Sequence, residues 1–99
     1  MLKGSIVVFA SGTGTTFKSI YEYSISEKSS YKVAALVTNR IDCGASHLAQ
    51  GFGVPVIPFP SQHMKFLEKL KPDLIVLSGF LKIFTPEFVE KYGKKTINI

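Results

Sequence analysis

Short apolar runs alternate with segments of helical character along the chain. Ser5–Ala10 is a continuous apolar run of the kind that is buried on both faces of a parallel sheet. Further runs rich in apolar and β-branched residues are predicted to be strands as well: Lys32–Thr38, Val54–Ile57, Leu74–Ser78 and Thr96–Ile99. The apolar pattern therefore predicts five strands, each separated from the next by an intervening segment.

The segments between these runs have the spacing or the end signals of helices. In the first, Phe17, Ile20 and Tyr21 follow the i, i+3, i+4 spacing of one helix face. Residues 85–87, Thr-Pro-Glu, combine a capping hydroxyl, a proline at the first helical position and an acid in the first turn. We predict helices over residues 16–26, over 44–50, from a Ser61 cap to Leu70, and from Thr85 to a stop at Gly93.

Strands that alternate with helices predict an α/β fold with a doubly wound, Rossmann-like parallel sheet. Pro55, Pro58 and Pro60 surround the third strand and favour an edge position, because proline cannot donate to a strand ladder. Right-handed crossovers bring the carboxyl ends of all strands to one edge of the sheet, where ligands of such folds bind. We therefore expect the functional residues to lie in the segments that follow the strands.

Composition narrows the class of protein. Of the 99 residues, 45% are hydrophobic and 19% are charged, which excludes a disordered chain. No apolar run approaches the length of a membrane span, so no membrane partner is expected. The net charge is +5, but the basic residues are scattered and not interleaved with aromatics, so no nucleic acid partner is expected either. A single cysteine, Cys43, excludes an internal disulfide and favours a reducing cytoplasm. His47 and His63 have no partner at metal-ligand spacing, and we expect no metal.

The segment Ser11–Thr16, Ser-Gly-Thr-Gly-Thr-Thr, follows the first strand and opens a helix. Its glycines let backbone N–H groups approach an anion, and its hydroxyls add donors, so it is suited to one phosphate monoester. We expect Gly14→Val to block phosphate binding and spare the fold. Two alternatives remain: a plain turn, and an NADP- or phosphate-binding module in which Gly12, Gly14 and Arg40 hold the cofactor.

Two further segments fall at the same predicted edge. Ser78–Phe84 is unusually apolar and can line a pocket for a flat ligand, or simply pack the next helix against the sheet. Asn98 is a polar residue within the last apolar run. Its amide can donate to a developing oxyanion without titrating, or can bond a neighbouring loop.

Together, these segments resemble the N-terminal half of the phosphoribosylglycinamide formyltransferases. The resemblance rests on Ile6–Phe17, Val37–Asn39 and Pro72–Pro86, in that order, and ends at Thr96–Ile99. Enzymes of this family transfer a formyl group from 10-formyltetrahydrofolate to the amine of glycinamide ribonucleotide in purine biosynthesis. The resemblance implies the same fold, substrates and folate co-substrate. The related formyltetrahydrofolate hydrolases need no phosphoribosyl site, and the glycine-rich loop argues against them.

The resemblance also implies roles for individual residues. Asn98 matches the catalytic asparagine, which orients the formyl group, polarises its oxygen and contacts the folate. The folate pocket is implied for Leu81, Lys82, Ile83 and Phe84. The residues implied to surround the ribonucleotide phosphate are Gly12, Thr13, Gly14, Thr15, Thr16, Phe17 and Lys18.

The chain departs from the family pattern in three places. The segment between the third strand and Pro72 is short and has no counterpart to an arginine that some family members place near the folate. The family usually has Ser-Asn where this chain has Thr15-Thr16, which keeps a hydroxyl and loses an amide. In the family a catalytic histidine follows the position of Ile99, and a later aspartate pairs with it. We therefore expect residues 1–99 to be the N-terminal, phosphoribosyl-binding part of a formyltransferase domain, truncated before that histidine and inactive alone. We also expect the open edge of the last strand to allow self-association.

Overall fold

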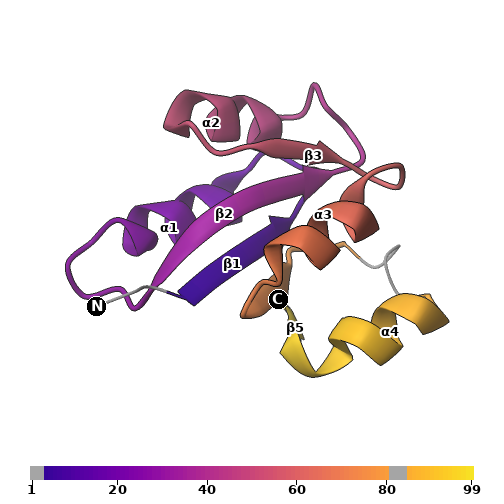
Figure 1. The fold of residues 1–99 in the computed structure, drawn as a ribbon. Coiled ribbons are helices and arrows are strands. Elements are labelled where there is room, and N and C mark those ends of the chain that lie inside the picture. Colours follow the sequence, from indigo (N-terminus) through magenta and orange to yellow (C-terminus); the bar gives the residue numbers. More distant parts are fainter. Residues whose placement is uncertain (1–3, 81–84) are drawn as a thin grey trace.

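A parallel sheet of five strands, in the order β3-β2-β1-β4-β5, forms the centre of the computed structural model, which describes residues 4–80 and 85–99 (Figure 1). Its helices and strands are β1 Gly4–Phe9, α1 Thr15–Ser24, β2 Tyr31–Thr38, α2 Gly44–Phe52, β3 Val56–Pro58, α3 His63–Leu70, β4 Leu74–Leu77, α4 Pro86–Tyr92, the 3-10 turn η1 Gly93–Lys95 and β5 Thr96–Asn98. Every pairing between neighbouring strands is parallel. The predicted doubly wound sheet and the edge position of its third strand are confirmed.

Side chains alternate between the two faces of the central strand β1. Ile6 and Val8 belong to a core that α1 and α2 cover, and Val7 and Phe9 to a second core that α3 and α4 cover (Figure 1). All four of these side chains are at most 5% exposed. Burying each stabilises the fold by roughly 1.5–3 kcal/mol relative to an exposed side chain, which explains why β1 is continuously apolar.

Helix α3 begins later than the sequence predicts. We expected Ser61 to cap it, but the helix starts at His63, and the residue before it, Gln62, makes no side-chain cap. The prolines at 58 and 60 have no N–H to donate, and the turn between β3 and α3 is closed instead by the Gln62 N–H, which donates to the Pro58 carbonyl at 3.2 Å. This turn includes Ser61, so the helix begins two residues after it.

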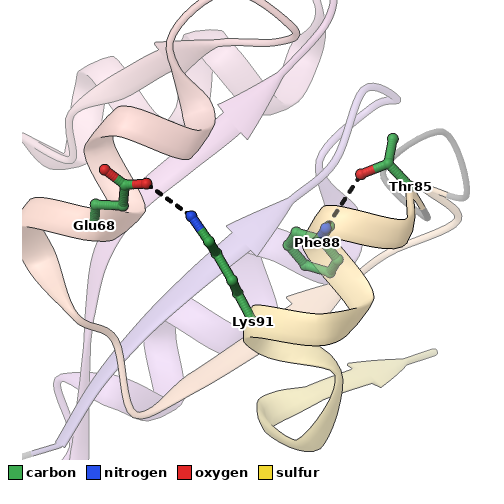
Figure 2. A network of polar contacts seen from close by, with 4 residues as sticks. All are labelled: Glu68, Thr85, Phe88 and Lys91. Atoms are coloured by element: carbon green, nitrogen blue, oxygen red, sulfur yellow. Dashed lines mark hydrogen bonds and ion pairs between the residues drawn. The ribbon is translucent and has the colours of Figure 1, made fainter.

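Helix α4 begins where its signals predict. The Thr85 hydroxyl oxygen accepts the Phe88 N–H at 3.2 Å, and Pro86 occupies the first turn (Figure 2). Figure 2 also shows the ion pair between Lys91 and Glu68, which joins α4 to α3. Its Nζ–Oε1 distance is 3.1 Å. The cap stabilises the helix by about 1 kcal/mol, and this half-exposed ion pair by less. Gly93 ends α4 as predicted, but with φ −54° the chain continues into η1 before β5.

The register aligns one residue of every strand in a row near the carboxyl edge of the sheet: Ile57, Val37, Phe9, Leu77 and Asn98. Residues in one row of a sheet point to the same face, here the face that α3 and α4 cover. The loops that follow these strands therefore all leave from one edge, and Asn98 lies in the row beside Leu77.

His63 lies at the start of α3 against an aromatic cluster near this edge. Its ring centroid is 4.5 Å from that of Phe59 and 6.3 Å from that of Phe9. Within residues 4–80 and 85–99, its buried Nδ1 atom makes no hydrogen bond of good geometry. Burial lowers the pKa of the imidazole below its ordinary value, against smaller opposing effects of the nearby Pro60 backbone and of the Glu87 carboxylate. The fold therefore holds His63 more readily in its neutral form.

This pKa shift predicts a loss of stability in mild acid. The unfolded chain takes up the proton at the ordinary pKa of about 6.5, and the folded chain only at lower pH. The free energy of unfolding should therefore be constant above about pH 6.5 and fall as the pH drops through the lowered pKa. Urea unfolding at pH 7.5 and pH 5.0 measures the loss. His63→Gln should reduce the loss, whereas the exposed His47→Gln should retain it. An equal loss in His63→Gln and the unmutated chain would refute this prediction.

Candidate functional site

A cavity of about 160 Å³ lies at the carboxyl edge, between the ends of β1 and β4. The chain leaves β1 for α1 on one face of the sheet and leaves β4 for α4 on the other, so this is the switch point at which such sheets bind ligands. We call it the phosphate cavity, and it is lined by Ala10, Gly12, Thr13, Gly14, Thr15, Thr16, Phe17 and Ser78. Of these lining residues, the sequence analysis predicted Gly12–Phe17 as part of the phosphate site.

The phosphate cavity lies at the N-terminus of α1. The first bond of this helix runs from the Lys18 N–H to the Gly14 carbonyl at 2.8 Å, so the three preceding amides have no acceptor four residues back in the helix. Gly14 offers no side-chain cap, and no acid lies in the first turn. Thr13 and Thr15 bring their hydroxyl oxygens within 3.2 Å of each other. Amides, hydroxyls and the positive end of the helix dipole together favour an anion in this cavity.

The glycine-rich loop packs directly against the first turn of α2. The Ala45 N–H donates to the Gly12 carbonyl at 3.1 Å, and a Cβ on Gly44 would collide with the Thr13 carbonyl. Gly14 has φ +92°, and a Cβ there would lie 2.7 Å from the Cα of Ala45 and 2.7 Å from Cδ1 of Leu48. The expectation that Gly14→Val spares the fold is therefore wrong. Gly14 is required by the packing of two backbone segments, whatever it does for a ligand.

The remaining residues predicted to hold the phosphate differ in their surroundings. Phe17 contributes to the cavity lining, but its ring is fully buried in the core, with its centroid 6.3 Å from that of Phe52. Lys18 is exposed and does not line the cavity. Ser78 does line it, from the opposite wall, and its N–H donates to the Phe9 carbonyl at 2.9 Å. The sequence analysis placed Ser78 in the segment that can line a pocket for a flat ligand, but not beside the glycine-rich loop; its place directly after β4, at the switch point, was the available signal.

Asn98 lies one strand further along the same edge. It ends β5 next to Leu77, the residue before Ser78, and the Ile99 N–H donates to the Leu77 carbonyl at 2.9 Å. Its side chain is exposed and does not line the phosphate cavity. Leu81, Lys82, Ile83 and Phe84, the predicted folate residues, lie outside the described residues. The described residue before them, Phe80, is buried, with its ring centroid 5.6 Å from that of Phe9 and 5.0 Å from that of Phe59.

The other side chains with reactive groups lie apart from this arrangement. Cys43 is buried at the start of α2, with its sulfur 3.6 Å from the Thr38 hydroxyl oxygen. His47 is exposed and His63 is half-buried. Across residues 4–80 and 85–99, no three histidine, cysteine or acidic side chains are grouped to hold a metal ion. In the same residues, every helix is too short or too polar to cross a membrane.

Comparison with known proteins links these features to one family. A family profile described as formyl transferase matches residues 4–99. The chain is 33% identical over 106 residues to the chloroplastic phosphoribosylglycinamide formyltransferase of Arabidopsis thaliana, matching 95% of this chain and 36% of that protein. It is 30% identical to the Haemophilus influenzae phosphoribosylglycinamide formyltransferase, with 95% and 50% covered. The chain thus spans a third to a half of the length of these relatives.

Solved structures show the same fold. The crystal structure of glycinamide ribonucleotide transformylase 1 from Geobacillus kaustophilus superimposes with a TM-score of 0.84 at 28% identity. The match covers 99% of this chain and 57% of that one. The predicted Rossmann-like sheet is therefore the fold of a solved formyl-transferring enzyme, and the glycine-rich loop and β5 both fall within the matched part.

Replacing Gly14 tests the packing of the loop against α2. Gly14→Ala should lower the free energy of unfolding by about 2–4 kcal/mol, because it adds left-handed strain and an overpacked methyl group. Gly51→Ala in α2 is the matched control: its Cβ meets no atom within 4 Å, and we expect stability equal to or up to about 1 kcal/mol above the unmutated chain. Urea unfolding measures both variants. A Gly14→Ala chain as stable as the Gly51→Ala chain would disprove the packing argument.

Proposed function

The chain belongs to the formyl transferase family, and from this premise we propose that it supplies the phosphoribosyl-binding part of a phosphoribosylglycinamide formyltransferase. The observation that carries the proposal is the phosphate cavity, formed by uncapped amides of α1 at the switch point of the sheet. Its volume of about 160 Å³ suits one phosphate group better than a dinucleotide. Family membership favours this function over the NADP-binding module that Arg40 left open.

We propose that the substrate is glycinamide ribonucleotide and that its phosphate occupies the phosphate cavity. Gly12 and Gly14 let the loop backbone approach the phosphate oxygens, and Thr13, Thr15 and Thr16 donate from their hydroxyl groups. Phe17 contributes its backbone amide, because its ring is buried in the core. Lys18 is exposed on the first turn of α1 and adds a positive charge nearby without lining the cavity.

We propose that Asn98 is the catalytic residue of formyl transfer. The substrate amine attacks the formyl carbon of 10-formyltetrahydrofolate, and negative charge develops on the formyl oxygen. The bond to the folate nitrogen then breaks as the amine loses a proton and the leaving folate nitrogen gains one. The Asn98 amide donates to that oxygen without itself titrating. Its place at the same edge as the phosphate cavity, beside Leu77, the residue before Ser78, supports this role. The folate is held by Asn98 with Leu81, Lys82, Ile83 and Phe84.

We also propose a reducing cytoplasm as the site of action. The one cysteine of the chain, Cys43, is a buried free thiol, which is the usual state of cysteine in a reducing compartment.

Gly12 offers the sharpest test of the phosphate site. A Cβ on Gly12 meets no atom within 4 Å and Gly12 is not left-handed, so the fold tolerates alanine, but the methyl group would stand at the wall of the phosphate cavity. Gly12→Ala should weaken the binding of ribose 5-phosphate at least tenfold, measured by titration calorimetry, with an unchanged melting temperature. Gly51→Ala should bind as the unmutated chain does. Unchanged affinity in Gly12→Ala, or no binding by the unmutated chain, would overturn the phosphate site.

The edge of β5 supports a further proposal, that the chain self-associates through this strand. β5 is an edge strand, and Ile97 and Ile99 are 47% and 61% exposed. Ile97 is aligned with Val76, so it extends the α1–α2 face of the sheet beyond its covered part. An open strand edge with exposed apolar side chains favours pairing with a second copy.

A charge on β5 should prevent this association. The unmutated chain should show a mass that rises with concentration in sedimentation equilibrium, whereas Ile97→Lys should remain a monomer, because a lysine cannot be buried in a paired edge. Ile41→Lys is the control, since Ile41 is equally exposed at 50% but lies in the loop after β2. An unmutated chain that stays monomeric at millimolar concentration would contradict the proposal.

A further inference from the structure

A second cavity adjoins the phosphate cavity on the side of β2. It has a volume of about 390 Å³ and is lined by Ser11, Gly12, Thr13, Arg40, Cys43 and Gly44. We call it the Arg40 cavity. Gly12 and Thr13 line both cavities, so the two lie on either side of one dipeptide. A single ligand of modest size that reaches past this dipeptide would occupy both.

Arg40 is fixed at its backbone and free at its side chain. Its N–H donates to the buried Thr38 hydroxyl oxygen at 3.1 Å, and its carbonyl accepts the Cys43 N–H at 3.0 Å. These bonds hold the loop after β2 in one conformation beside the glycine-rich loop. The guanidinium is exposed, and within the described part of the chain it has no ion-pair partner, although Asp42 lies in the same loop. The backbone of Arg40 is therefore held in place, while its guanidinium group is free to contact a ligand.

Apart from Arg40, the lining of the Arg40 cavity consists of glycines and small side chains. Gly44 carries no side chain because a Cβ would collide with the Thr13 carbonyl, and Gly12 leaves open space above its own Cα. Cys43 adds a small apolar surface, since its thiol is turned toward Thr38. A lining without large side chains, beside an exposed planar guanidinium, leaves room for an aromatic ring, which guanidinium groups stack on more readily than ammonium groups do.

We propose that the Arg40 cavity takes the nucleobase of a nucleoside 5′-monophosphate whose phosphate occupies the phosphate cavity. In sheets of this topology, a nucleotide bound at the first glycine-rich loop extends its ribose toward the end of the second strand, where Arg40 lies. The inference rests on the proposed phosphate site and adds a second class of ligand to it. Because a nucleotide and the phosphoribosyl substrate would share one phosphate cavity, they would exclude each other.

Comparing the affinities of adenosine 5′-monophosphate and ribose 5-phosphate separates the contribution of the nucleobase from that of the phosphate. In titration calorimetry with the 99-residue chain, the nucleotide should bind about five- to tenfold more tightly than the sugar phosphate, the range expected for one stacked cation and ring. Arg40→Gln should reduce that advantage to less than about twofold and leave ribose 5-phosphate binding unchanged. Lys32→Gln, which removes an equal charge from an exposed position at the opposite end of β2, should alter neither.

Each other outcome identifies what has failed. If both ligands bind equally to the unmutated chain, the nucleobase site does not exist, although the phosphate site does. If Arg40→Gln weakens both ligands equally, Arg40 acts on the phosphate and the base assignment is wrong. If Lys32→Gln matches Arg40→Gln, the effect is one of net charge alone and the assignment is again wrong. If neither ligand binds the unmutated chain, the phosphate site fails, and with it both this inference and the proposed function.

Discussion

The contact between the glycine-rich loop and the first turn of α2 is the constraint on which the rest of the site depends. Two backbone segments meet there with no room for a Cβ on Gly14 or Gly44, and the Ala45 N–H joins them through the Gly12 carbonyl. Because α2 is itself packed on the α1–α2 core through Ala45 and Ala49, the loop has the rigidity of the core although it lies at the edge of the sheet. A loop held in this way loses little entropy when an anion binds.

The same contact explains why the two cavities are separate. The loop crosses between α1 and α2, and its Gly12–Thr13 dipeptide becomes a wall that faces β4 on one side and the loop after β2 on the other. Gly14 and Gly44 have no room for a Cβ, whereas a Cβ on Gly12 would meet no atom within 4 Å, although the Gly12 carbonyl accepts the Ala45 N–H. A side chain at Gly14 would therefore disturb the packing, whereas one at Gly12 would change the cavities without a clash.

Much of the fold could be predicted from the sequence, because the deciding forces are local or depend on the apolar pattern. The buried run of β1 and the Thr85 cap of α4 both act within a few residues, and both were placed correctly. The start of α3 was missed because a proline-rich turn, closed by Gln62, competes with the Ser61 cap. The place of Gly14 in the glycine-rich loop was predicted, but its packing role was not, since its neighbours Ala45 and Leu48 are about thirty residues away in the sequence. Contacts of that kind come only from the packed structure.

Ser78 shows what the topology adds to a motif. A loop motif such as Ser11–Thr16 is contiguous in the sequence, so it can be recognised without knowing which strand lies beside it. The opposite wall of the cavity is decided by strand order: β4 pairs with β1, so the residue after β4 faces the loop after β1. The same pairing extends to β5, where the register aligns Asn98 with Leu77 and places it next to the strand that carries Ser78. The phosphate cavity and Asn98, for which we propose a catalytic role, therefore lie at neighbouring strand ends because of strand order, and this geometry requires that β4 and β5 remain paired.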